Sequence, residues 1–192
     1  SIHSGRVTAV MGPSGAGKTT FMTTLAGKAY YGDQKGTILL NGKDEPLSKY
    51  KNIVGFVPQE DVMMRDMSVK ENLAHSAHLR LSNDSTNIQR RDAVNHAIDI
   101  LNLYDVRHSL IGDENTRGVS GGQRKRVNIG IEMVADPAVL FLDEPTSGLD
   151  STGSLEVCTA LRNIAESGLT VVTVIHQPRY EIFTMFHDVL LL

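Results

Sequence analysis

The sequence predicts an α/β fold whose core is a mostly parallel β-sheet. Three continuous apolar runs, residues 7–11, 139–143 and 171–175, are typical of strands buried on both faces of a parallel sheet. A segment with helical spacing follows each run, as expected where strands alternate with helices. Residues 66–112 interrupt this alternation with a helical pattern alone. We therefore expect an α/β core that carries an inserted helical subdomain and some peripheral antiparallel strands.

The first third of the chain predicts three strands and one helix. The helix after the first apolar run has Phe21 and Leu25 on one face and a stop at Gly27. Residues 37–40 precede an Asn-Gly turn, which favours a hairpin strand that is antiparallel and peripheral. Residues 53–57 are apolar and β-prone, and Pro58 ends this strand directly before Gln59.

The predicted helical subdomain contains two amphipathic helices separated by a polar loop, residues 82–86. Ser68 and Glu71 have the spacing of a capping box that opens the first helix. The apolar faces of the two helices consist of Leu73, Ala77 and Leu81, and of Val94, Ile98 and Leu101. We expect a single domain over 1–192, with the α/β core in 1–65 and 113–192 and the helical subdomain in 66–112.

Composition excludes several classes of protein. The 192 residues carry a net charge of -3, which argues against nucleic-acid binding through bulk basicity. The single cysteine, Cys158, excludes an intrachain disulfide and is expected to pack as a small apolar residue on a helix over residues 152–167. No apolar run reaches the length of a membrane span, and no signal-peptide pattern is present. Because both ends lie close to core strands, we expect a fragment of a longer chain.

Residues 12–19 fit the phosphate-loop pattern G-x-x-x-x-G-K-[ST], between a predicted strand and a predicted helix. A loop that turns into a helix N-terminus offers unpaired N–H groups and a positive dipole end to a triphosphate. Glycines keep this approach open, Lys18 can reach the β- and γ-phosphates, and the Thr19 hydroxyl can hold Mg²⁺. The sequence therefore predicts a phosphate-loop NTPase core, with nucleotide-binding residues Gly12, Pro13, Ser14, Gly15, Ala16, Gly17, Lys18, Thr19 and Thr20.

Two carboxylates close the apolar strand 139–143 and extend past it. At the C-terminal edge of a parallel sheet, Asp143 and Glu144 should face the same crevice as the phosphate loop. Asp143 suits Mg²⁺, with water between them, and Glu144 suits polarising an attacking water. The alternative is that Asp143 caps a turn and Glu144 is solvated.

A second helix start has the residues of an anion site. Ser120 and Gln123 form a capping-box pattern ahead of Val127, Ile131 and Val134, which explains them as an ordinary helix start. Gly121 and Gly122 would also leave the N-terminus bare, for which a protein with one phosphate loop has no internal use. Lys125 and Arg126, next on this helix, are expected to be a solvated face.

Taken together and in order, these motifs resemble an ABC-type ATPase over essentially the whole chain. The resemblance rests on the phosphate loop, Gln59, residues 120–123, Asp143-Glu144, the run Ser147-Gly148-Leu149-Asp150, and His176. Within that family, residues 118–130 and His176-Gln177-Pro178-Arg179 look like the G (White-type) half-transporters.

The resemblance implies a two-part site for ATP and Mg²⁺. ATP would lie on the phosphate loop of one subunit and be covered by residues of a second subunit, namely Ser120, Gly121, Gly122, Gln123 and Asp150. Glu144 would be the general base, His176 would contact the γ-phosphate, and Gln59 would touch Mg²⁺ and the attacking water. The catalytic candidates are then Glu144, His176 and Gln59, and the metal candidates are Thr19, Gln59 and Asp143.

The implied partners are a second nucleotide-binding domain, identical or different, and a transmembrane domain of the same longer chain. The implied location is the cytoplasmic face of a membrane, with no nucleic-acid partner. Two other functions compete: a soluble ABC-type ATPase acting on nucleic acid or ribosomes, and a nucleotide-binding module without turnover. The short inserted block and the single ATPase unit disfavour the former, and the presence of Glu144 and His176 disfavours the latter.

Overall fold

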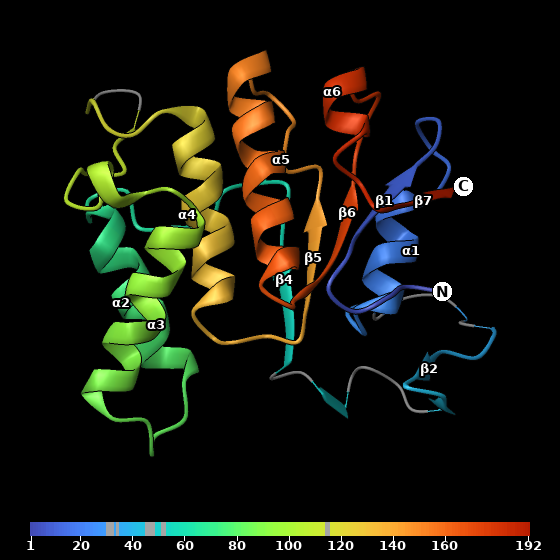
Figure 1. The fold of residues 1–192 in the computed structure, drawn as a ribbon, viewed down its shortest axis with the longest axis horizontal. Coiled ribbons are helices and arrows are strands. Elements are labelled where there is room, and N and C mark those ends of the chain that lie inside the picture. Colours follow the sequence, from blue (N-terminus) through green and yellow to red (C-terminus); the bar gives the residue numbers. More distant parts are fainter. Residues whose placement is uncertain (30–32, 34, 45–48, 51–52, 114–115) are drawn as a thin grey trace.

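A parallel β-sheet forms the centre of the molecule (Figure 1). The computed structural model describes residues 1–29, 33, 35–44, 49–50, 53–113 and 116–192. Within these residues the central sheet has five strands, in the spatial order β4 (Val54–Val57), β5 (Val139–Asp143), β6 (Thr170–Val174), β1 (Val7–Met11) and β7 (Asp188–Leu191). Each neighbouring pair is parallel. The predicted α/β class and mostly parallel sheet are confirmed.

Helices bury both faces of this sheet. On one face, α1 (Lys18–Leu25) packs Met22 against Phe141 and Val172. On the other, α4 (Gly121–Met133) and α5 (Ser151–Glu166) cover Leu140 and Leu142. Successive strand residues point to opposite faces, so a strand covered on both sides is apolar at most positions, with Thr8 and Thr173 as buried exceptions. This is why the apolar runs in the sequence are continuous.

The described part of residues 66–112 is helical, as predicted. It contains α2 (Val69–Arg80), α3 (Asn87–Ile100) and a 3₁₀ turn, η2 (Tyr104–Val106), beside α4 and away from β7 (Figure 1). The capping box at Ser68 forms, and its hydrogen bonds hold the pKa of Glu71 below its ordinary value. The predicted apolar positions are buried, except for Leu81, which is only partly buried.

The two connections to this helical block run side by side. The amide N–H of Ile111 donates to Met67 O (3.0 Å), and that of Gly112 donates to Arg65 O (3.0 Å). These hydrogen bonds hold the segment that leads into the helical block next to the segment that leaves it. The division of the chain into core and subdomain at these positions stays a prediction.

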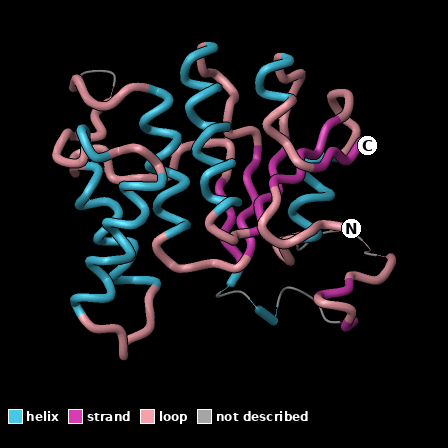
Figure 2. The backbone as a smooth tube through the Cα atoms, viewed as in Figure 1, coloured by secondary structure: helices cyan, strands magenta, loops and turns pink. Residues whose placement is uncertain are grey.

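A small hairpin lies apart from the central sheet (Figure 2). Its strands, β2 (Leu39–Leu40) and β3 (Lys43–Asp44), are antiparallel, which confirms the predicted hairpin. Asn41 and Gly42 between them both have positive φ (51° and 79°), as in the mirror-image turns that hairpins favour. The strand is shorter than the predicted residues 37–40, because only Leu39 and Leu40 are paired.

The parallel arrangement brings the C-terminal ends of β1, β4, β5 and β6 to one edge of the sheet, the upper edge in Figure 1. The loops that leave these strands carry the phosphate loop, Gln59, Glu144 and His176. Among the described residues, we find no helix with the length and hydropathy of a membrane span.

Candidate functional site

The phosphate loop joins β1 to α1, and glycine is needed at its positions for two different reasons. Gly15 (φ 80°) and Gly17 (φ 85°) are left-handed, and a Cβ at either position would meet no atom within 4 Å. Their backbone therefore faces open space, as a loop that approaches a ligand requires. At Gly12 a Cβ would lie 2.5 Å from Leu192 O. Gly12 is therefore required by the close approach of the chain after β7, a packing reason that the sequence did not reveal.

Lys18 is buried at the first position of α1, with 5% of its surface exposed. Its Nζ donates to Pro13 O (2.8 Å) and to Gly12 O (3.2 Å), so the side chain curls back over the loop. The ammonium group is held on the loop by backbone carbonyls rather than by a carboxylate. Its positive charge favours the ionised form of the nearby Asp143, and it lies at the place where the motif would bind phosphates.

Thr19 and Asp143 form the donor set that suits a cation. The Thr19 hydroxyl donates to Asp143 Oδ1 (3.1 Å). Burial raises the pKa of Asp143, and this is only partly opposed by the hydrogen bond from Thr19. A buried carboxylate with a raised pKa gains from a nearby cation, which favours its charged form. Hydroxyl and carboxylate oxygens are the ligands that Mg²⁺ prefers, so the residues present fit this ion.

The described residues contain no group of three or more His, Cys, Asp or Glu side chains placed to hold a metal ion. This agrees with the way Mg²⁺ is usually bound, through one or two carboxylates plus water and substrate phosphates.

Glu144 follows β5 in a left-handed conformation (φ 47°), which is uncommon outside glycine. Two residues from other strand ends hold its carboxylate. His176 Nε2 lies 2.8 Å from Oε1, and the Gln59 amide donates to Oε2 (3.3 Å). Gln177, beside His176, is also left-handed (φ 39°). The positive φ at these two residues turns the chain sharply as it leaves β5 and β6.

Eight of the predicted residues line one cavity of about 340 Å³, whereas Asp143 and Asp150 do not line it. Its lining consists of Ser14, Gly15, Gly17, Lys18, Thr19, Thr20, Glu144 and His176. Gly12, Pro13 and Ala16 belong to the same loop but do not line the cavity. Gln59 contacts Glu144 rather than the pair Thr19–Asp143 where the sequence placed a metal. No residue of 120–123 lines this cavity.

The start of α4 lies elsewhere and forms the predicted capping box. Ser120 Oγ accepts a hydrogen bond from the backbone N–H of Gln123 (3.2 Å), and Gln123 Oε1 accepts one from the backbone N–H of Ser120 (2.9 Å). Ser120 and Gly121 are exposed, whereas Gly122 is buried. A Cβ on Gly122 would lie 3.1 Å from Gly153 Cα of α5, so this glycine also serves helix packing.

Asp150, which the resemblance predicts as a contact between subunits, makes a hydrogen bond to a nearby residue of its own chain. Its Oδ1 accepts from the Gly153 amide (2.8 Å) and caps the N-terminus of α5. A capping carboxylate of this kind is fixed in position before any partner arrives.

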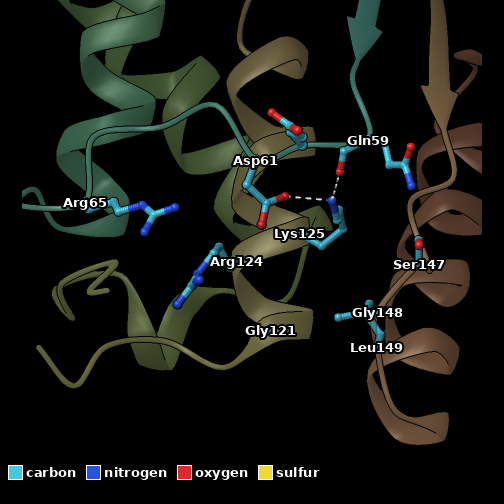
Figure 3. A pocket seen from close by; sticks show the side chains of 10 residues that line it. Gln59, Asp61, Arg65, Gly121, Arg124, Lys125, Ser147, Gly148 and Leu149 are labelled. Carbon is cyan, nitrogen blue, oxygen red and sulfur yellow. Dashed lines mark hydrogen bonds and ion pairs between the residues drawn. The ribbon is translucent and has the colours of Figure 1, made fainter. Parts of the chain in front are cut away.

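The expectation that Lys125 and Arg126 form a solvated face is wrong, since each is only 5% exposed. Lys125 Nζ donates to Gln59 O (2.7 Å) and pairs with Asp61 (2.7 Å; Figure 3). Arg126 pairs with Glu156 of α5 (2.9 Å) and donates to the carbonyl of Leu101. The reason is that α4 is covered by the sheet, by α5 and by α2.

Comparison with known proteins agrees with this geometry. The family described as "ABC transporter" matches residues 1–147 of the chain.

The chain belongs to the ABC transporter family.

Its similarity to named relatives is high over nearly its whole length. It is 53% identical over 188 residues to ABC transporter G family member 28 of Arabidopsis thaliana, covering 98% of this chain and 17% of that protein. It is 50% identical over 191 residues to putative white-brown complex homolog protein 30 of the same plant, covering 100% and 18%. It is 50% identical over 188 residues to ABC transporter G family member 25 of Oryza sativa subsp. japonica, covering 98% and 19%.

The resemblance to the G subfamily of ABC transporters is thereby confirmed, and the nucleic-acid alternative finds no support among these relatives. This ABC transporter chain spans less than a fifth of the length of each of these three proteins.

Proposed function

We propose that this chain is the ATP-binding and ATP-hydrolysing domain of a G-type ABC transporter. Two such domains would close around two ATP–Mg²⁺, and hydrolysis would release them, which drives a substrate across a membrane. One observation carries the proposal: the phosphate loop and a carboxylate held by His176 line a single cavity. The membrane location, on the cytoplasmic face, and the transmembrane partner rest on family membership alone.

The phosphate loop and the first turn of α1 would bind the nucleotide. The bare N–H groups of Gly15 and Gly17 and the Lys18 ammonium provide positive charge for a triphosphate. Thr19 and Asp143 would hold Mg²⁺, which supplies charge neutralisation to the phosphates when bound.

Glu144 would remove the proton of the attacking water. His176 and Gln59 each contact one of the two carboxylate oxygens, so the base has a defined orientation before substrate enters. His176 also lines the nucleotide cavity and can reach the terminal phosphate from there.

The second half of the site would come from another subunit. Ser120 and Gly121 are exposed and lie outside the cavity of their own chain, yet they form a bare helix N-terminus. A partner's nucleotide is an anion that such a terminus suits. The partner can be a second copy of this chain or a different domain of the same family.

Two variants test the proposal. Lys18→Ala should lose ATP affinity by more than tenfold, because a charged hydrogen bond is worth about 1.5–3 kcal/mol. Glu144→Gln should keep ATP binding while hydrolysis falls by roughly 10²–10⁴-fold. Calorimetry measures the first effect, and phosphate release by the complete protein measures the second.

The matched controls are Lys43→Ala and Glu181→Gln, which change exposed residues away from the cavity. Both should behave as wild type. Unchanged ATP affinity in Lys18→Ala, or hydrolysis by Glu144→Gln within a few-fold of wild type, would contradict the proposed site.

A further inference from the structure

Lys125 reaches from α4 to the loop that follows β4. Figure 3 shows its side chain between the backbone of Gln59 and the carboxylate of Asp61. Both distances from Nζ are 2.7 Å. The Lys125 side chain is 6% exposed and that of Asp61 is 24% exposed. A buried ammonium is costly without its partners, so these three residues are held together tightly. We call this set the Lys125 tie.

The Lys125 tie ends at the catalytic carboxylate. Gln59 accepts from Lys125 through its backbone carbonyl, and its side-chain amide donates to Glu144 Oε2 (3.3 Å). A shift of the Gln59 backbone therefore also moves the amide that orients Glu144.

At its other end the tie belongs to the helix that starts at Ser120. Lys125 is five residues after Ser120, less than two turns along a helix whose capping box is complete. A short capped helix moves as a rigid body, so displacement of its N-terminus carries Lys125 along.

We propose that Lys125 is a positioning residue that couples the two composite sites through one subunit. This inference rests on the proposed function, in which Ser120 covers the nucleotide of the partner. When Ser120 closes on that nucleotide, Lys125 moves with α4 and sets Gln59, and hence Glu144, in the site of its own chain. Each ATP thereby promotes hydrolysis of the other, which appears as positive cooperativity.

The experiment compares Lys125→Met with wild type in the complete protein. Methionine keeps the length and removes the charge. ATP affinity of the isolated domain should stay within about twofold, because Lys125 does not line the nucleotide cavity. The turnover rate should fall about tenfold, because a general base contributes roughly 10²–10⁴-fold and a poorly oriented one loses part of this. The Hill coefficient for ATP should fall towards 1.

The Hill coefficient separates coupling from a merely structural role. Partial misfolding lowers the active fraction and hence the rate, but it leaves the cooperativity of the remaining molecules unchanged. Arg162→Met is the matched control, since it removes an exposed ion pair on α5 and should change neither quantity. If Lys125→Met fails to fold, Asp61→Asn on the exposed side of the tie carries the same test.

The failures are distinguishable. A Lys125→Met variant with the wild-type Hill coefficient overturns this inference, even if Glu144→Gln is inactive and the proposed function stands. Normal hydrolysis by Glu144→Gln would contradict the proposed function itself, and with it the coupling that rests on that function.

Discussion

The acidic pair that follows β5 places two adjacent carboxylates in different surroundings. Asp143 is 9% exposed and accepts a hydrogen bond from Thr19. Glu144 turns away through a positive φ and is held by His176 and Gln59 instead. The left-handed turn at Glu144 thus separates the carboxylate that we propose for Mg²⁺ from the one that we propose as general base.

We expect Asp143→Asn to remove the thermal stabilisation that Mg²⁺ gives in the presence of ATP. Because burial raises the pKa of Asp143, the ionised form that prevails at neutral pH is penalised in the folded chain. The amide removes that penalty, so without ligands the variant should melt no lower than wild type. Differential scanning fluorimetry with EDTA, with Mg²⁺, and with Mg²⁺ and ATP measures both effects.

The same carboxyl gives this Mg²⁺ effect a pH dependence. As pH falls through the raised pKa of Asp143, protonation removes the charge that attracts the cation, so stabilisation by Mg²⁺ should fade at a higher pH than an ordinary aspartate would cause. Asp99→Asn, an exposed control on α3, should keep the wild-type response. An undiminished Mg²⁺ effect in Asp143→Asn would show that another group binds the ion.

The thiol of Cys158 should be inert in the folded chain. Its side chain is buried in α5, as predicted, and burial raises its pKa to about 12. Since the thiolate is the reactive form, a disulfide reagent at pH 8 should label no cysteine in the native chain and one per chain in guanidinium chloride. Stoichiometric labelling of the native chain within minutes would contradict this burial.

Helix α4 shows how one element combines a site with a packing surface. Its exposed start carries the proposed cap for a partner's nucleotide, while all positions from Lys125 to Gly130 are buried. Gly122 lies between the exposed start and the buried part of the helix. Because it has no side chain, α4 can approach the Gly153 backbone of α5 closely. The same helix turn therefore meets a packing demand and a binding demand.

We expect Gly122→Ala to destabilise the fold by about 1–2 kcal/mol through overpacking. Its new Cβ would lie 3.1 Å from Gly153 Cα, a backbone atom that cannot rotate away. Gly121→Ala is the matched control, since its Cβ would meet the side-chain end of Leu149 (3.2 Å), which can move. That variant should stay within about 0.5 kcal/mol of wild type. Urea unfolding compares the two, and equal stabilities would argue against close packing of α4 on α5.

At the scale of the whole molecule, the parallel sheet gathers one half of the site at its C-terminal edge and leaves the other half outside. The phosphate loop, Asp143, Glu144 and His176 come from three strand ends. Ser120 lies beyond this cavity. A chain with this arrangement needs a second subunit to complete the nucleotide site that we propose.

Ser120→Tyr should therefore abolish ATP-dependent dimers without weakening ATP binding to the monomer. Sedimentation in ATP and Mg²⁺ measures this best with Glu144→Gln present, because the closed dimer then cannot be discharged by hydrolysis. The bulky ring would fill the space that a partner's γ-phosphate needs. Dimers that form as well with Ser120→Tyr as without it would contradict capping by a second subunit.

Thr86→Tyr provides the control for this variant. Thr86 and Gln89 form the same capping box at the start of α3, so this variant loses a cap of about 1 kcal/mol as well. It should dimerise as the unmodified chain does. A difference between the two variants thus reports the position of Ser120 and not the loss of a helix cap.

The sequence by itself determined the features that depend on neighbours in the chain. The phosphate loop, the capping boxes at Ser68 and Ser120 and the Asn41-Gly42 hairpin are set by residues no more than a few positions apart, and their physics is local. The continuous apolar runs likewise predicted a sheet covered on both faces.

Only the tertiary structure decided which distant groups meet. Lys125 lies 66 residues from Gln59, and Glu144 lies 85 residues from Gln59, so no spacing rule could pair them. The strand order β4-β5-β6-β1-β7 and the contact of Gly122 with Gly153 arise in the same way. Periodicity shows that a face is buried but not against what, because the identity of a partner depends on how the whole chain folds back. For this reason the sequence alone could name candidate residues for the site, whereas it could not predict the bonds that hold the Glu144 carboxylate.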